Sequence, residues 1–248
     1  MSTTLGIMDW GIGGLSVYQQ FRFQNKSTNI CYLSDSGFTP YGKLSKEQMQ
    51  SRFENIADFF KSRQVSIVFV ACNAASSALD GVEQVIRDVR FISLIPFGVT
   101  QVQKSQFKHV AVIGGDLTIS SKSYERYFSE KSEKKINYVS AQPLSALVEA
   151  GELSGEHVEQ IIRKIFTQLD SPDCILLACT HYPALIPTFK KLYPHLDYLD
   201  PAVLMAASCD LNGENQFQFY TTGSAPETQK AARAAFHIEL NLINSVNI

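Results

Sequence analysis

The sequence predicts an α/β protein with mainly parallel sheets flanked by helices. Apolar, β-branched runs alternate with segments of helical period along a chain of 248 residues. Such near-continuous apolar runs are typical of parallel strands that helices cover on both faces. Residues 68–76 and 176–184 also share one pattern: an apolar strand, Ala-Cys, a polar residue and a helix. If this weak repeat is real, each half brings one thiol to the carboxyl end of a strand, where open α/β sheets bind ligands.

Apolar runs along the chain are interpreted as strands, and the clearest helix follows Ser45. The strands span residues 4–9, 29–35, 65–72, 91–96, 109–115, 136–141, 173–180 and 216–222. Ser45 and Gln48 form a capping-box pattern, which marks the start of a helix. Apolar residues from Met49 to Phe60 then recur at helical spacing, so we expect one face of this helix to be buried.

The composition argues against nucleic-acid and membrane partners. The net charge is only −2 and acidic and basic residues are interspersed, so there is no basic stripe or polybasic tail. The first residues lack a basic segment followed by an apolar one, and no apolar run approaches the roughly 18 residues of a membrane-spanning helix. We therefore expect a soluble, cytoplasmic protein.

The five cysteines predict neither a disulfide framework nor a zinc site. Their number is odd, no CxxC pair occurs, and the five histidines are scattered, so we expect reduced thiols and no structural metal. We interpret Cys31, Cys174 and Cys209 as small buried hydrophobic residues, which is the usual role of a free cysteine in a strand.

Cys72 and Cys179 differ because each lies where a strand leads into a helix. Helix N-termini stabilise anions and lower the pKa of thiols. The neighbouring Asn73 and Thr180 can hydrogen-bond a small polar ligand. His181 has two interpretations: it activates a thiol or donates a proton itself, or it is a structural hydrogen-bonding residue at a strand end.

Two further segments are candidates for contact with a ligand. Residues 9–21 contain a glycine-rich turn whose amides suit a carboxylate or phosphate, although Ser16 replaces the third glycine of a dinucleotide fingerprint. Asp9 is equally well interpreted as a cap for this turn or as a functional acid. Residues 34–45 form a loop that presents Pro-Tyr-Gly at 40–42, unless the segment is an ordinary turn before the capped helix.

Four segments together resemble one known family. They are DWGIGGLS (9–16), TPYGKLSKE (39–47), ACNAAS (71–76) and ACTHYP (178–183), in this order. From Leu5 to about Ala206 the chain is similar to the glutamate racemases of the cofactor-independent aspartate/glutamate racemase superfamily. The resemblance implies two pseudo-symmetric α/β domains, residues 1–97 with 210–248 and residues 98–209, and an active site in the cleft between them.

The resemblance also implies roles for individual residues. Cys72 matches the base toward the D enantiomer, and Cys179 matches the base toward the L enantiomer. The residues that assist these thiols are Asp9, His181 and Glu149. The implied substrate-binding residues are Asp9, Trp10, Pro40, Tyr41, Gly42, Asn73, Ala74, Thr180 and His181. The implied partner is an amino-acid substrate whose D-glutamate product serves peptidoglycan synthesis, with no cofactor, metal, nucleic acid or membrane, and a homodimer is compatible with the family.

Elementary chemistry agrees with a pair of thiols. Racemisation exchanges a proton between the two faces of Cα, so two bases on opposite walls require no movement of the substrate. A thiol with an ordinary pKa of about 8.5 is a useful base only if the charge that develops on the carboxylate is stabilised. One site must also hold a thiolate while the other holds a thiol.

Three positions depart from the family pattern. Trp10 replaces a usual serine, and Ala74 and Gly115 each replace a usual threonine. The first two of these positions, Trp10 and Ala74, adjoin the substrate in the family, so two hydroxyl donors are missing there. An unpaired polar group in a closed site costs roughly 1 to 3 kcal/mol. Trp10 can instead close the pocket or donate its indole N–H. The alternatives are racemisation of aspartate or another small amino acid, and a non-catalytic domain pair that binds a ligand or a protein partner.

Overall fold

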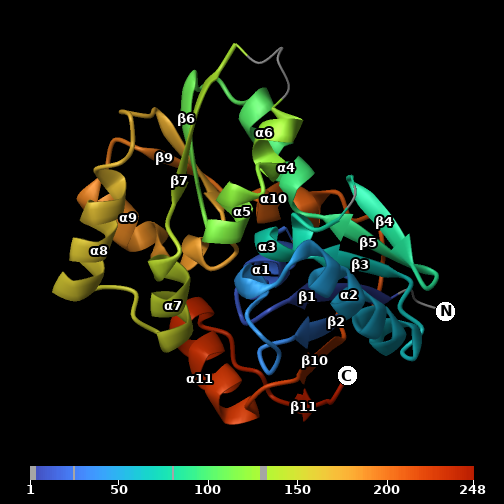
Figure 1. Ribbon diagram of the computed structural model, residues 1–248. Coiled ribbons are helices and arrows are strands. Elements are labelled where there is room, and N and C mark those ends of the chain that lie inside the picture. The colour runs from blue at the N-terminus through green and yellow to red at the C-terminus, as the bar shows by residue number, and fades with distance from the viewer. Residues whose placement is uncertain (1–3, 25, 80, 129–132) are drawn as a thin grey trace.

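The computed structural model describes residues 4–24, 26–79, 81–128 and 133–248, and it confirms the α/β class (Figure 1). The larger sheet has the order β11 (Ile243–Ser245), β10 (Phe217–Thr221), β2 (Asn29–Ser34), β1 (Thr4–Asp9), β3 (Ile67–Val70), β5 (Val89–Ser93) and β4 (Glu83–Ile86). The smaller sheet has the order β7 (Lys135–Ser140), β6 (His109–Gly114), β8 (Cys174–Ala178) and β9 (Asp197–Leu199). Within the described residues every strand pair is parallel except β4 with β5.

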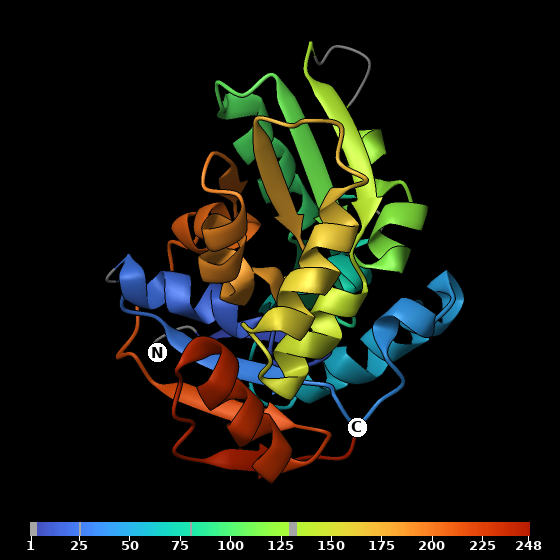
Figure 2. The ribbon, with the colours of Figure 1, turned by 90° about the vertical axis from the view of Figure 1, so that its left-hand side faces the viewer.

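Helices connect successive strands, except the antiparallel pair β4 and β5, and flank both sheets (Figure 1). They are α1 (Leu15–Phe23), α2 (Lys46–Lys61), α3 (Asn73–Ser76), α4 (Ile95–Lys104), α5 (Asp116–Ser120), α6 (Ser123–Tyr127), α7 (Pro143–Ala150), α8 (Glu156–Phe166), α9 (Ile186–Leu192), α10 (Pro201–Ala207) and α11 (Ala225–Phe236). Short 3-10 turns, η1 (Tyr41–Lys43) and η2 (Tyr182–Leu185), follow β2 and β8. The C-terminal helix α11, red in Figures 1 and 2, contacts α7, the helix that follows β7 of the smaller sheet. Below, each sheet with its helices is called one half of the molecule.

The capping box at the start of α2 is confirmed. The Gln48 amide N–H donates to Ser45 Oγ at 3.2 Å, and the Ser45 amide N–H donates to Gln48 Oε1 at 2.8 Å. These bonds satisfy two amides that have no partner within the helix. The start of α2 is thereby fixed directly after the loop that carries the Pro-Tyr-Gly triplet.

Several strands are shorter than the sequence predicts, and the difference places the two cysteines. β3 and β8 both end before their cysteine, so Cys72 and Cys179 lie just beyond the carboxyl ends of the two strands. β5 ends at Ser93 because Pro96 falls in the first turn of α4, a position that proline favours. The cysteines therefore belong to the loops above the sheets.

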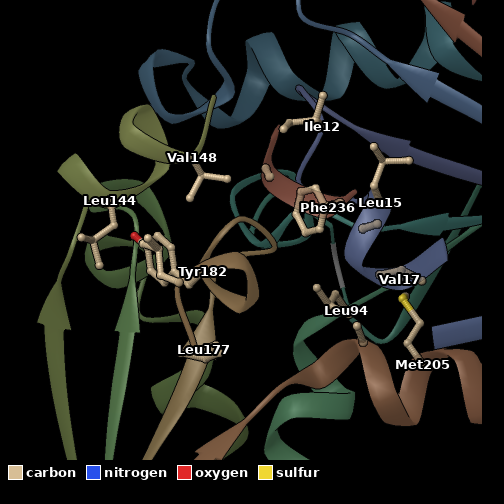
Figure 3. Packing of buried hydrophobic residues seen from close by; sticks show 14 of the residues in the cluster. Ile12, Leu15, Val17, Leu94, Leu144, Val148, Leu177, Tyr182, Met205 and Phe236 are labelled. Atoms are coloured by element: carbon tan, nitrogen blue, oxygen red, sulfur yellow. The ribbon is translucent and has the colours of Figure 1, made fainter. Parts of the chain in front are cut away.

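One apolar cluster joins the two sheets and their helices. Figure 3 shows members from both parts of the molecule, among them Ile12, Leu15, Leu144, Val148, Leu177, Tyr182 and Phe236. Cys31, Cys174 and Cys209 are buried, which confirms the interpretation of these thiols as core residues. In the described part of the chain, no helix has both the length and the apolar character needed to cross a membrane.

Candidate active site

The residues singled out in the sequence meet in one cavity of about 400 Å³. Its wall contains every predicted site residue: Asp9, Trp10, Pro40, Tyr41, Gly42, Cys72, Asn73, Ala74, Glu149, Cys179, Thr180 and His181. It also contains residues that the sequence reasoning did not select, among them Lys43, Leu117, Thr118, Gln142 and Ser145. A signal for Gln142 was present, since it follows the predicted strand 136–141 and so lies at the carboxyl edge of the sheet.

Cys72 lies in a negative and nearly closed environment. It is 8% exposed and precedes the first residue of α3. Burial raises the pKa of the Cys72 thiol well above its ordinary value, and the neighbouring Asp9 carboxylate raises it further. The start of α3 does lower this pKa through the Ala75 amide, as expected, but burial and Asp9 outweigh it, so the net shift is upward.

Asp9 proves to be both a cap and a wall of the cavity. Its carboxylate accepts hydrogen bonds from the amides of Trp10 at 2.8 Å and Gly14 at 2.7 Å. Thr180 Oγ1, from the other half, donates to Asp9 Oδ2 at 3.4 Å. Burial raises the pKa of Asp9 even though these amides and the charge of His181 favour the ionised form.

Cys179 belongs to a chain of three polar groups. Its Sγ lies 3.6 Å from His181 Nδ1, and His181 Nε2 lies 2.6 Å from Glu149 Oε1. Burial opposes a charge on the imidazole, but hydrogen bonds with Cys179 and Glu149 raise the pKa of His181 well above its ordinary value. Burial likewise opposes the Glu149 charge, but His181 lowers the pKa of this carboxyl. The His181 ring therefore faces Cys179, while the Asp9 carboxyl group faces Cys72.

The glycine-rich turn accommodates side chains of the other half. A Cβ atom at Gly11 would overlap the Glu149 carboxylate, and one at Gly13 would lie 2.5 Å from His181 Nδ1. The amides of Ile12 and Gly14 donate to Glu149 and Asp9. The expectation that these amides bind an external carboxylate or phosphate is therefore wrong, because carboxylates of the chain itself accept from them.

Asn73 presents a buried amide to the cavity. Its side chain is 2% exposed, and its Oδ1 accepts a 2.7 Å hydrogen bond from the Tyr124 hydroxyl of α6. Its Nδ2 is buried and has no hydrogen-bond partner within the described residues. A buried donor without a partner is costly, so a carboxylate in the cavity would satisfy it.

The structure shows how the site is filled at two of the positions that depart from the family pattern, Trp10 and Gly115. The Trp10 indole N–H donates to the Phe38 carbonyl at 3.0 Å, so Trp10 lines the cavity and binds the loop between β2 and α2. At Gly115, a Cβ atom would lie 2.8 Å from Gln142 Oε1. The Gln142 side chain therefore occupies the space that a threonine side chain would enter.

No group of three or more metal-ligating side chains is arranged to hold a metal ion in the described ranges. Asp9 accepts from a backbone amide, His181 and Glu149 bond to each other, and Asn73 Oδ1 accepts from the Tyr124 hydroxyl.

A cavity between two α/β halves, with one cysteine from each, agrees with the class that the four motifs resemble. The sequence profile of the Asp/Glu/Hydantoin racemase family matches residues 5–209, and the chain belongs to this family.

Relatives and solved structures agree with this membership. A glutamate racemase of Persephonella marina is 30% identical, over 92% of this chain and 91% of the relative. The solved glutamate racemase of Aquifex pyrophilus is 26% identical, has a TM-score of 0.77, and aligns over 97% of this chain and 98% of its own. A glutamate racemase isoform of Bacillus anthracis has the same fold, with 24% identity and a TM-score of 0.84 over 99% and 98% of the two chains.

Proposed function

We propose that this protein is a cofactor-independent glutamate racemase that acts in the cytoplasm and supplies D-glutamate for peptidoglycan. The observation that carries the proposal is the pair of thiols, Cys72 and Cys179, which come from different sheets and line one cavity. Such a pair can remove a proton from one face of Cα and return one to the other. Membership of the family and the similarity to glutamate racemases support glutamate as the substrate.

The surroundings of the two thiols differ. His181 Nδ1 lies 3.6 Å from Cys179 Sγ, whereas burial and the neighbouring Asp9 raise the pKa of Cys72 and so favour its thiol form. Two-base catalysis requires this asymmetry. With L-glutamate, Cys179 Sγ takes the Cα proton and Cys72 gives its proton to the opposite face; with D-glutamate the roles reverse.

The cavity also offers partners for the polar groups of an amino acid. Asn73 Nδ2 is a buried donor without a partner in the described residues and is assigned to the α-carboxylate, and Thr180 also lines the cavity. Asp9 is the buried acid on the same side as Cys72 and can accept from the ammonium group. Donors held in place before the reaction stabilise the charge that develops when Cα loses its proton.

The sheets support a division into two domains, residues 1–97 with 210–248 and residues 98–209. β10 and β11 come from the end of the described chain, yet β10 pairs with β2 of the larger sheet. β6, β7, β8 and β9 form the smaller sheet. The thiols of the proposed mechanism then come from separate domains.

The test is isotope exchange at Cα. Each enantiomer of glutamate is incubated with the protein in D₂O, and deuterium at Cα is measured by NMR or mass spectrometry. We expect exchange from both enantiomers, and a loss of racemisation of about 100-fold or more in Cys72→Ser and in Cys179→Ser. Retention of protium by the folded wild-type protein would contradict the proposal.

Racemisation of a smaller amino acid is the second candidate, because Trp10 adds a large indole where the family has a serine. The mechanism would be the same, and only the substrate would change. Circular dichroism of a panel of L and D amino acids separates the two candidates. Faster turnover of aspartate than of glutamate would favour this second candidate, and a clear preference for glutamate would remove it.

A further inference from the structure

The loop between β2 and α2, residues 35–44, forms part of the cavity wall. Tyr41 and Gly42 of this loop line the cavity directly. The backbone attaches the loop only at its start among the bonds described, where the Asp35 amide donates to the Asp9 carbonyl of β1 at 2.9 Å. Further along, side-chain contacts at Tyr41 and Phe38 attach it. Three of the residues that hold the loop, Asp35, Arg52 and Thr222, do not line the cavity and play no part in the chemistry proposed above.

Asp35 anchors the first side of the loop. Its side chain is fully buried, and Arg52 of α2 binds it with Nε at 2.8 Å and Nη2 at 2.6 Å. The Tyr41 hydroxyl donates to Asp35 Oδ2 at 2.7 Å, and Thr222 Oγ1 donates to Asp35 Oδ1 at 2.9 Å. A two-pronged guanidinium and two hydroxyls thus fix both carboxylate oxygens, the geometry in which charge-assisted bonds are strongest.

The same arginine reaches further along the loop and beyond it. The Arg52 guanidinium lies over the Phe38 ring, 4.2 Å from its centroid, and its Nη1 donates to the backbone oxygen of Ile248 at 2.6 Å. The Phe38 carbonyl in turn accepts the indole N–H of Trp10. Arg52 therefore contacts both Asp35 and Phe38, the two points at which the loop is attached.

We propose that Asp35, Arg52 and Thr222 are positioning residues that set the place of Tyr41 in the active cavity. Thr222 directly follows β10, so a strand from the end of the described chain controls a wall of the site. Arg52 is 4% exposed and Asp35 is buried, and breaking such a pair leaves a buried charge without a partner. Conservative changes are therefore required to test position separately from folding.

The chain offers a matched pair of variants and its own optical probe. Thr222→Val keeps the shape of the side chain but removes the hydroxyl, which donates to Asp35 Oδ1 at 2.9 Å and accepts from the Gly37 amide of the loop at 3.0 Å. Thr188→Val is the control, because Thr188 lies on α9, outside the loop, and its hydroxyl donates to a backbone carbonyl, that of Leu153, at 2.6 Å. Trp10 is the single tryptophan of the chain, so intrinsic fluorescence reports on the attachment of the loop.

The kinetic readout rests on the proposed function, and the fluorescence readout does not. We expect Thr222→Val to raise KM for glutamate about threefold to tenfold with kcat nearly unchanged, because a lost hydrogen bond that orients the site weakens binding. Arg52→Lys, which keeps the charge and loses the two-pronged geometry, should act in the same direction. Both variants should shift the Trp10 emission, whereas Thr188→Val should match the wild type in KM and in emission.

The outcomes separate this inference from the proposed function. A wild-type protein without glutamate turnover would contradict the proposed function, and the emission of the variants would still test the positioning residues. If Thr222→Val and Arg52→Lys retain their fold by circular dichroism and show the emission and KM of the wild type, the three residues only stabilise the fold and the inference is wrong.

Discussion

At the scale of single residues, hydrogen bonds between the two halves decide which way a functional group points. Asn73, which lines the cavity, illustrates this, because the Tyr124 hydroxyl binds its carbonyl oxygen and leaves the buried Nδ2 without a partner within the described residues. The phenol also fills the space behind the amide, since Tyr124 is 1% exposed. The orientation of a residue on α3 is therefore set by a residue on α6.

Removing this hydroxyl should weaken substrate binding. In Tyr124→Phe the Asn73 amide loses the bond that orients it, so we expect KM for glutamate to rise about threefold to tenfold. The control is Tyr198→Phe, because the Tyr198 hydroxyl is buried without a partner within the described residues. Steady-state kinetics followed by circular dichroism measure both variants, and equal KM values in the two would contradict the assigned role of Tyr124.

At the scale of elements, the turn between β1 and α1 allows side chains of the other half to approach its backbone closely. Gly11 and Gly13 have no side chains, and Glu149 and His181 of the other half occupy the space beside them. The turn therefore acts as a surface against which the His181–Glu149 pair is packed. Its glycines are needed for close approach of two protein segments.

A methyl group on this turn should disable the site while the protein stays folded. In Gly13→Ala the new Cβ would lie 2.5 Å from His181 Nδ1 and 2.7 Å from Thr180 Oγ1, so His181 must move away from Cys179. We expect kcat to fall about 100-fold or more, as when a general acid or base is lost. Gly81→Ala provides the contrast, because its Cβ meets open space at a φ of 103°. This backbone conformation disfavours alanine, so the melting temperature should fall without a loss of kcat. Similar kcat values in both variants would overturn the steric explanation.

At the scale of the whole molecule, the two halves share one apolar cluster. Phe236, at the end of α11, lies within the cluster that also contains Leu177 of β8 and Leu15 of α1 (Figure 3). Burial of apolar surface between the halves couples their stability. The molecule should therefore unfold as one unit despite its two sheets.

A cavity in this cluster should destabilise both halves together. Phe236 is 3% exposed, and Phe236→Ala should lower the free energy of unfolding by about 3 to 5 kcal/mol. Phe23→Ala is the control, because Phe23 is 70% exposed and should change that free energy by about 0.5 kcal/mol or less. Urea denaturation followed by circular dichroism measures both, and two separate transitions, of which only one moves, would contradict the coupling.

The fold class and most of the cavity could be predicted because both depend on local sequence pattern. Apolar runs give the strands, and the residues after Val70 and Ala178 must then lie at the carboxyl edges of the sheets. The edge strands β4, β9 and β11 have three or four residues each. These are too few residues to show the alternation of apolar and polar side chains that predicts a strand. Tyr124 and Arg52 act through partners that lie 51 and 17 positions away in the sequence, and no local pattern encodes such pairings.

The contact between the glycine turn and the His181–Glu149 pair also limits how the two halves can change over evolutionary time. Here a larger residue at Gly11 or Gly13 is tolerated only if the facing side chain in the other half shrinks at the same time. The effect of a substitution on one side therefore depends on the residue on the other side, and the two segments must change together.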